Sequence, residues 1–358
     1  MPIIPDFISD ILREATIDIC LRCDNRDLWQ KSLDNISYVP VDYLHEVLDF
    51  QLEYESSFGG DIADISMVIK YNSVPCVVWP LFYKLIDNIP YFRTTSTSIL
   101  SPLFTVNTSK SVRKFLSKEL IRIFEKICSY AGVNSFTVDE IFQNNIGVSD
   151  WHYEMIRLGA ICTVRYDLFV DLSMEISYIK SGFRKSYRSL INKGLKIWNV
   201  EVLNCVDQNI WNEFKELHLR VAGKITRSES TWDLHLSYIG MGKAFLVYLR
   251  DLNGNLVGGG YFLYSRTECF YSVGVYDRSL FSEPLGHVVQ YVAIVEMKKL
   301  NISWYKLGVR NSPYYIPKPN EKEISISEFK EGFASQVAHR YSLTYNIDSF
   351  NNPSSIVQ

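Results

Sequence analysis

The sequence predicts a mixed α/β (α+β) protein that is built from two domains of similar plan. Its 358 residues are roughly twice the length of a common domain. Hydrophobic residues make up 47% of the chain and charged residues 22%, a composition typical of globular proteins. Each half also repeats one order of patterns, namely a hairpin, a crossing loop, a helix and a strand. We therefore expect domains at residues 1–170 and 171–345, each a mixed sheet flanked by helices, and a flexible tail at 346–358.

The first half carries signals for a hairpin followed by a long helix. Two apolar runs flank a turn that contains Pro75, a residue that suits a turn better than a central strand. A serine hydroxyl can cap a helix N-terminus, and a glycine is typical of the position just after a helix. The expected elements are a hairpin over 65–83 with its turn at 72–75, a helix that begins after Ser109 or Ser111 and ends just before Gly132, and a strand over 135–138.

The second half shows three strands before its main helix. A turn at 251–255 separates the first two strands, and the helix that begins at His287 is apolar nearly all round. Three glycines at 258–260 lie inside one strand, where they would allow a bulge or the close approach of a ligand. The expected elements are helices over 175–195 and 209–221, strands over 245–249, 257–264 and 270–276, a helix over 287–300 and a strand over 302–307.

Charge and cysteine usage exclude several functional classes. A net charge of −3 excludes a generally basic nucleic-acid binder, so a polyanion would have to meet a local basic patch. The cysteines are scattered, and the Cys20/Cys23 pair has no second pair at zinc-ligand spacing, so we expect neither disulfides nor a metal site. The chain shows no signal-peptide pattern and no apolar run of the ~18 residues that span a bilayer. We therefore expect a soluble cytoplasmic protein.

A basic segment between the halves is the sharpest local signal. On one continuous helix, Lys180, Arg184 and Arg188 would lie on one face, where their like charges repel one another. Together with Lys185 they would suit the phosphates of a substrate or of an RNA backbone, because guanidinium groups bind phosphate in a bidentate way. The alternative is a solvated basic face without a ligand.

Two further segments could form parts of a site. The turn that leads through Gly286 into the helix at His287 would let backbone N–H groups meet a phosphate, although an ordinary strand-to-helix turn has the same pattern. Lys330 lies between two aromatic residues, where it could stabilise an oxyanion or could simply cover a hydrophobic edge. The expected loop over 217–233 mixes basic, hydroxyl and aromatic groups and contains Arg227.

Four segments stand in an order that resembles a known family. They are the basic segment with Arg184 and Arg188, the helix start at 284–287, the strand at 304–308 and the segment at 329–333. This arrangement resembles the Fem-type (FemAB-like) branch of the GNAT acyltransferase superfamily, over about residues 175–342. The resemblance implies two tandem GNAT-like domains. It also implies transfer of an acyl or aminoacyl group from an activated donor to an amine, commonly on a cell-envelope precursor.

The resemblance also implies roles for individual residues. Phe329 and Lys330 match the family's Phe-Lys pair and would lie at the reacting carbonyl, with Arg184 or Arg188 at the acceptor phosphates. The donor stays open between acyl-CoA and aminoacyl-tRNA. The helix start lacks the usual CoA-binding pattern apart from Gly286, and no sustained heptads indicate a coiled-coil arm for tRNA. No cofactor is expected to be tightly bound.

The predicted function is that of an N-acyltransferase that works by direct attack of an amine, without a covalent enzyme intermediate. Its acceptor would be a phosphorylated or nucleotide-linked sugar or peptide precursor of the cell envelope. Tyr276, His287 and Glu283 are alternative proton acceptors. A non-catalytic GNAT-fold module that binds RNA or an anionic glycan is the alternative function. The predicted substrate-binding residues are Arg184, Lys185, Arg188, Tyr276, Gly286, His287 and Arg227, and the predicted catalytic residues are Phe329 and Lys330.

Overall fold

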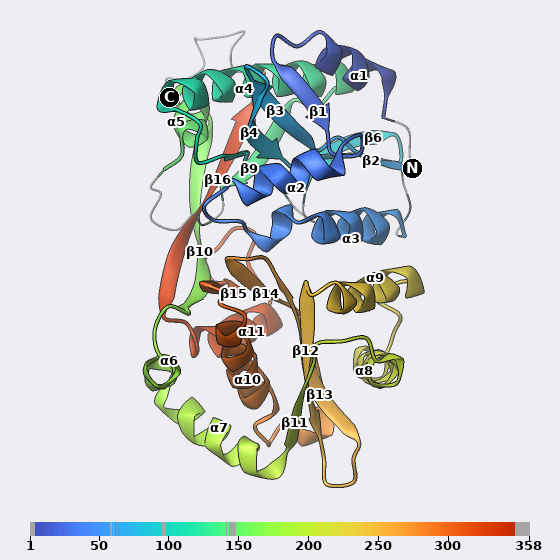
Figure 1. Cartoon of the computed structure of the whole chain (residues 1–358), viewed down its shortest axis with the longest axis vertical. Helices are drawn as coiled ribbons and strands as arrows, with labels where there is room; N and C mark the ends of the chain where they lie inside the picture. Colours follow the sequence, from blue (N-terminus) through green and yellow to red (C-terminus); the bar gives the residue numbers. More distant parts are fainter. Residues whose placement is uncertain are drawn as a thin grey trace. The chain divides into compact units, whose positions relative to one another are not determined.

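A computed structural model of the chain describes residues 4–57, 59, 61–94, 98–140, 142 and 148–347 (Figure 1). The chain divides into two compact units, each considered by itself. The second unit consists of residues 39–41 and 166–338, and the first contains the remaining described residues. The first unit includes most of the last strand, β16 (Gln336–Asn346), because this strand pairs with β9 (Ser135–Glu140). The predicted domains differ from this division, since they assign residues up to 345 to the second domain. Most of the predicted tail lies outside the described residues.

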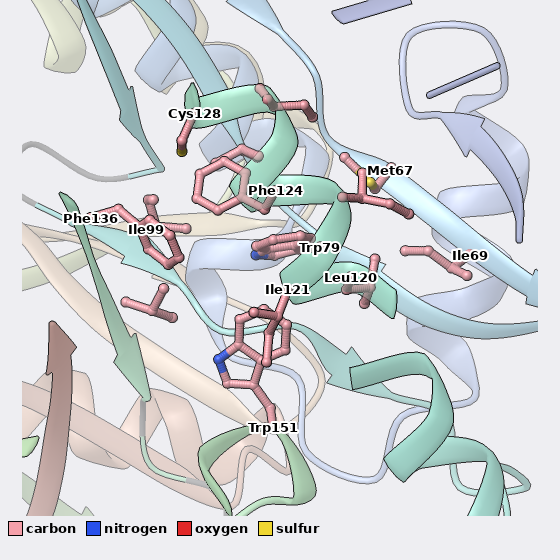
Figure 2. Close-up of a cluster of buried hydrophobic side chains, with 14 of the residues drawn as sticks. Met67, Ile69, Trp79, Ile99, Leu120, Ile121, Phe124, Cys128, Phe136 and Trp151 are labelled. Atoms are coloured by element: carbon pink, nitrogen blue, oxygen red, sulfur yellow. The ribbon is translucent and has the colours of Figure 1, made fainter. Parts of the chain in front are cut away.

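The first unit packs a long helix, α4 (Lys110–Ala131), against a sheet with the order β1-β3-β4-β8. Phe124 of the helix and Trp151 both contact Trp79 of the sheet, with ring centroids 5.3 and 5.2 Å apart (Figure 2). These rings anchor a buried apolar cluster. The other elements of this part of the chain are α1 (Asp6–Arg13), β1 (Asp18–Leu21), α2 (Arg26–Asp34), η1 (Val41–Tyr43), α3 (His45–Ser56), β2 (Asp61–Asp64), β3 (Met67–Tyr71), β4 (Val74–Trp79), β5 (Phe82–Ile86), β6 (Ile89–Arg93), β7 (Ile99–Leu100), β8 (Leu103–Phe104) and α5 (Asp150–Arg157).

The predicted elements of the first half are present, with one shift. The β3–β4 turn consists of Asn72 and Ser73, both with positive φ, as a tight hairpin turn requires. Pro75 therefore lies in β4 and not in the turn. β8 pairs with residues 77–78 of β4 and not with position 75. Pro75, which has no N–H to donate, therefore leaves no hydrogen bond to β8 unmade. The Ser109 side chain caps α4 by accepting a hydrogen bond from the backbone N–H of Val112.

The second unit is a sheet in the order β11-β12-β13-β14-β15-β10 with helices on both faces (Figure 1). β14 and β15 are parallel and pair at 268–270 with 304–306. Beyond these pairs β14 continues along β13, while β15 continues along β10, so the two strands diverge. The elements are β10 (Ile161–Asp171), α6 (Ile176–Gly182), α7 (Lys185–Ile197), β11 (Asn199–Leu203), α8 (Gln208–Ala222), α9 (Glu229–Gly240), β12 (Ala244–Arg250), β13 (Leu256–Tyr264), β14 (Glu268–Tyr276), η2 (Arg278–Leu280), α10 (Leu285–Lys299), β15 (Trp304–Val309) and α11 (Glu321–Glu331).

The predicted continuous helix over 175–195 is wrong. Phe183 and Arg184 are extended, which breaks the segment into α6 and α7. Tertiary contacts cause the break, because Phe183 packs on Phe333 at 5.1 Å and the Arg184 backbone N–H donates to the Gly332 carbonyl at 2.8 Å. Lys180 consequently does not stack with the arginines on one helix, and its Nζ donates to Asn192 Oδ1 at 2.8 Å.

The predicted loop over 217–233 is also shorter in the structure. Gly223 ends α8 in a left-handed conformation, and the Ser228 side chain caps a second helix, α9, that the sequence patterns did not indicate. The segment around Lys330 is likewise helical, in α11, whose N-terminus has a capping box of Asn320 and Glu323.

Candidate functional site

The side chain of Lys330 marks the centre of the candidate site. It extends from the last turn of α11 toward the diverging strands β14 and β15. Its Nζ lies 5.7 Å from the ring centroid of Tyr271 on β14. On β15, Gly308 has φ +122°, and a Cβ there would stand 3.0 Å from the lysine Nζ. The absence of a side chain at Gly308 therefore makes room for the ammonium group.

The surroundings of Lys330 change its proton affinity. Burial lowers the pKa of Lys330 to about 8, and the negative charge of Asp167 on β10 partly opposes this shift. With that pKa, Lys330 is mostly protonated at pH 7. The site therefore presents a cation in largely apolar surroundings, where its field is weakly screened.

Four of the other predicted residues pack together beside Lys330. If Gly286, at the start of α10, had a Cβ atom, this atom would lie 3.1 Å from the Phe329 ring and 3.5 Å from the Tyr276 ring. His287 packs edge-on against Phe329, with centroids 5.1 Å apart, and against Tyr187 at 4.5 Å. Burial lowers the pKa of His287 to about 4, so this imidazole is neutral at pH 7.

Two tyrosines that the sequence patterns missed, Tyr271 and Tyr305, join the predicted Tyr276 behind Lys330. The hydroxyl groups of Tyr271 and Tyr276 are 3.0 Å apart, and the hydroxyl of the buried Tyr305 donates to Gln290 Oε1. Burial raises the pKa of Tyr271 to about 12, so its phenol is neutral at pH 7. The signal for these rings was the glycine run at 258–260. A Cβ at 258 or 260 would stand 2.7 or 2.9 Å from the rings of Tyr276 and Tyr271, so the run makes room for aromatic rings of the same sheet.

The basic residues of α7 lie at one border of this cluster. The Arg184 guanidinium donates to the Tyr187 hydroxyl at 3.3 Å and to the Glu328 carbonyl at 3.2 Å. Tyr187 is also the ring that contacts His287. In the same first turn of α7, Lys185 is exposed and Arg188 is partly exposed. The first turn of α7 is thus connected to the Lys330 cluster through Arg184 and Tyr187.

The structure does not bring Arg227 to the Lys330 cluster. Its guanidinium lies 5.1 Å from the Trp232 ring centroid and 3.4 Å from His235 Nδ1. His235 in turn packs on Tyr261 of β13 at 4.6 Å. Side chains alternate along a strand, so Tyr261 and the neighbouring position 260 point to opposite faces. Position 260 faces Tyr271, on the side of the Lys330 cluster. Tyr261 therefore points to the opposite side of the sheet, where His235 and Arg227 pack on it.

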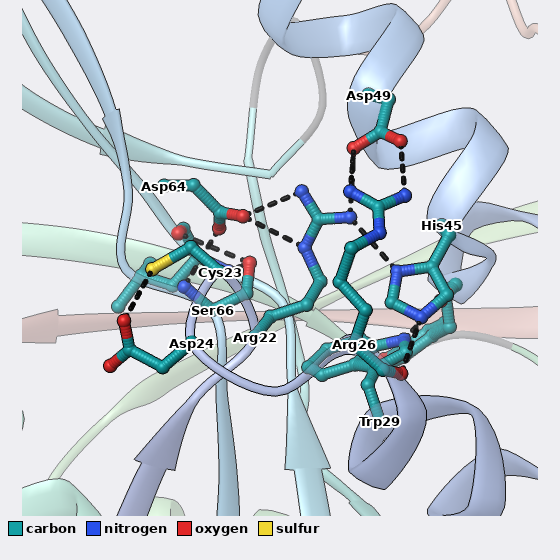
Figure 3. Close-up of polar contacts among 11 residues, drawn as sticks. Arg22, Cys23, Asp24, Arg26, Trp29, His45, Asp49, Asp64 and Ser66 are labelled. Atoms are coloured by element: carbon teal, nitrogen blue, oxygen red, sulfur yellow. Dashed lines mark hydrogen bonds and ion pairs between the residues drawn. The ribbon is translucent and has the colours of Figure 1, made fainter. Parts of the chain in front are cut away.

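A separate polar cluster lies in the first unit (Figure 3). Arg22 is 2% exposed and forms ion pairs with Asp64 at 2.5 Å and with Asp49 at 2.9 Å. Asp49 also binds Arg26 in a bidentate way. His45 Nδ1 accepts from Arg22, since arginine can only donate, and His45 Nε2 donates to the Arg26 carbonyl. These contacts balance the buried charges and tie β1, α2 and α3 together.

The first unit also contains cavities that are lined by residues away from the Lys330 cluster. One, of about 440 Å³, lies beside the Arg22 cluster and is lined in part by Cys23, and another, of about 540 Å³, lies between α1 and α4.

Cys20 and Cys23 are free thiols. Among the described residues, no group of three or more His, Cys, Asp or Glu side chains could hold a metal ion. Within the same residues, every helix is too short or too polar to cross a bilayer.

Comparisons with known proteins identify the fold. No family model and no curated protein sequence matches the chain. Among solved structures, FemX superposes with a TM-score of 0.64 at 12% identity, over 88% of this chain and 94% of that one. L-PGS from Bacillus licheniformis gives 0.52 at 13% identity, over 97% and 93%. A tandem GNAT protein from the clavulanic acid biosynthesis pathway gives 0.52 at 12% identity, over 92% and 98%. The chain therefore has a tandem GNAT fold.

Proposed function

We propose that this protein is an N-acyltransferase whose reaction takes place at the Lys330 cluster. The observation that carries the proposal is the charged Lys330, held in apolar surroundings beside Phe329, where β14 and β15 diverge. A preorganised cation in such a place stabilises negative charge that develops on a substrate oxygen. The solved structures of similar fold, FemX, L-PGS and a tandem GNAT protein of clavulanic acid biosynthesis, support a transferase of acyl or aminoacyl groups.

The proposed reaction is direct attack of an acceptor amine on the donor carbonyl. The new C–N bond forms a tetrahedral intermediate, and the ammonium group of Lys330 stabilises its oxyanion. Collapse of the intermediate breaks the bond to the donor's thiol or ribose hydroxyl, which leaves with a proton. Proximity of the two bound substrates supplies a large part of the rate. No covalent bond to the protein is required.

The surroundings of the three predicted proton acceptors bear on the role that each could take. Burial raises the pKa of the Tyr276 phenol well above 10, so it holds its proton at pH 7. The Glu283 carboxylate forms an ion pair with Lys193 at 2.7 Å. His287 is a neutral imidazole at pH 7 and packs on Phe329. None of the three is a strong base at pH 7, since a pKa of about 4 also makes His287 a weak proton acceptor, and we propose that water carries the amine proton away.

The packing at the start of α10 bears on the donor. In GNAT-type binding of CoA, backbone N–H groups at a helix N-terminus would meet the pyrophosphate. Here the Phe329 and Tyr276 rings occupy the space beside Gly286. This packing favours aminoacyl-tRNA over acyl-CoA as the donor. The acceptor we propose is a phosphate-bearing amine of a cell-envelope precursor, with Arg184, Lys185 and Arg188 as the groups that meet its phosphates.

Two measurements test the proposed function. The first is calorimetric titration with acetyl-CoA and with CoA at low and moderate salt, for which we expect no micromolar binding to the wild type. The second is a transfer assay with a panel of aminoacyl-tRNAs and amine acceptors. We expect Lys330→Ala to lower turnover by about 10²- to 10³-fold, because it removes the charge that stabilises the oxyanion.

Lys322 provides the matched control, since it is an exposed lysine in the first turn of the same helix. Lys322→Ala should transfer at the wild-type rate. If Lys330→Ala also transferred at that rate, the proposed role of the lysine would be wrong. Salt-sensitive RNA binding without any transfer would support the alternative of a non-catalytic module.

A further inference from the structure

The last turn of α11, from which Lys330 extends, is held by donors of another helix. The final carbonyl groups of a helix have no partners further along it, so they need donors from elsewhere. The first turn of α7 supplies them. Arg184 Nη2 donates to the Glu328 carbonyl at 3.2 Å, and the Tyr187 hydroxyl donates to the Phe329 carbonyl at 3.2 Å. A third donor, the backbone N–H of the same arginine, bonds at 2.8 Å to the carbonyl of the glycine that follows α11.

Tyr187 is the centre of these contacts between α7 and α11. Its buried side chain accepts a hydrogen bond from Arg184 Nη1 at 3.3 Å and donates its own to α11. Its ring packs on Phe333 and on His287, with centroids 4.9 and 4.5 Å apart. Gly332 makes this packing possible, because a Cβ there would lie 2.2 Å from a carbon of the Tyr187 ring. Since Gly332 has φ −64°, which any residue adopts, the closeness of the ring and not the backbone requires glycine here.

We propose that Tyr187 is a positioning residue of the site, which holds the last turn of α11 together with Arg184 and so fixes Lys330 in its place beside Gly308. A cation stabilises an oxyanion only when it is held where the charge develops, and a small displacement costs rate. The guanidinium also places a positive charge at the negative end of the α11 dipole, which favours the same arrangement. The inference rests on the proposed function where it treats Lys330 as a group of the reaction site.

Hydrogen exchange tests the contacts without any substrate. Tyr187→Phe keeps the ring and removes the hydroxyl. The amides of residues 332–334, which donate to carbonyls 329–331, should then exchange about 3- to 10-fold faster than in the wild type, the range that the loss of one hydrogen bond corresponds to. The amide of Ile324, which donates to the Asn320 carbonyl in the first turn of α11, should keep its wild-type rate. Unchanged exchange at 332–334 would overturn the proposal.

Transfer kinetics test whether the position of the lysine matters to the reaction. Tyr187→Phe should lower kcat by about 3- to 10-fold and leave the KM for the acceptor unchanged, because the bound substrates would meet a displaced cation. Faster exchange with an unchanged kcat would mean that Tyr187 only stabilises the fold, and the positioning role would be wrong. If the wild type transferred no group to any acceptor, the proposed function would fail alone, and the exchange rates would still decide whether Tyr187 holds the turn.

Two further variants complete the test. Tyr178→Phe is the matched control, since Tyr178 is a 65% exposed tyrosine of α6, and it should keep the wild-type exchange rates and kcat. Gly332→Ala keeps the Tyr187 hydroxyl but pushes its ring away, so it should also speed exchange in the last turn and lower kcat, although alanine favours helix more than glycine does. Wild-type values in Gly332→Ala, or equal changes in Tyr178→Phe, would contradict the proposal.

Discussion

Lys330 should make the stability of the protein depend on pH above neutrality. Its pKa is about 8 in the folded chain and close to 10.5 when the chain is unfolded. The two values differ by about 2.5, and at about 1.36 kcal/mol per pH unit the difference is worth ~3 kcal/mol. Below pH 8 both states hold the proton, and burial of the charged amine costs this full amount. Between pH 8 and 10.5 the unfolded state holds more protons, so the free energy of unfolding rises with pH.

Urea unfolding of the wild type and of Lys330→Met, followed from about pH 7 to pH 10.5, measures this effect. Other groups also titrate in this range, but they are common to both proteins and cancel in the difference. We expect the wild type to gain up to ~3 kcal/mol relative to Lys330→Met across the range. Lys322→Met, on the exposed side of the same helix, should follow the wild type at every pH. A constant difference between wild type and Lys330→Met would show that the lysine has an ordinary pKa.

Three other variants probe separate parts of the structure. Gly194→Ala should lower the free energy of unfolding by ~1–3 kcal/mol in urea, because its Cβ would stand 2.1 Å from Val288 Cγ2, and unchanged stability would refute the close packing of α7 on α10. Arg22→Met leaves Asp64 without its buried partner and should cost ~3–5 kcal/mol by thermal unfolding, whereas a loss under about 1 kcal/mol would contradict the charge balance described above. Phe329→Ala should open the N-terminus of α10 and give measurable CoA binding by calorimetry, and a variant that binds CoA no better than the wild type would argue against the ring as the obstacle.

Local signals predicted the elements whose ends are set by the chain itself. The helix after Ser109 and the hairpin around Asn72 and Ser73 follow from a side-chain cap and from turn geometry, which involve neighbouring residues only. The break between α6 and α7 could not be found in this way. It depends on Phe183 and Arg184 contacting residues about 150 positions later, at 332–333, and helical spacing contains no trace of such contacts.

The candidate site shows the same division. Phe329, Lys330, Gly286 and His287 were identified from their own segments, and the structure brings them together. Tyr271 and Tyr305 were missed because their places in the site depend on how β13, β14 and β15 pair, and this register is not visible in any strand alone.

The return of the chain to the first unit has a consequence for folding during synthesis. Residues 166–338, together with the earlier 39–41, make up the second unit, so its chain is complete before His339 has been made. The first unit must wait for β16, which supplies the partner of β9 and the buried side chains of Leu343 and Tyr345. On a ribosome the second unit can therefore finish folding first, in contrast to the usual order in which N-terminal domains fold before later ones. Truncation after residue 338 would then damage the unit that was synthesised first.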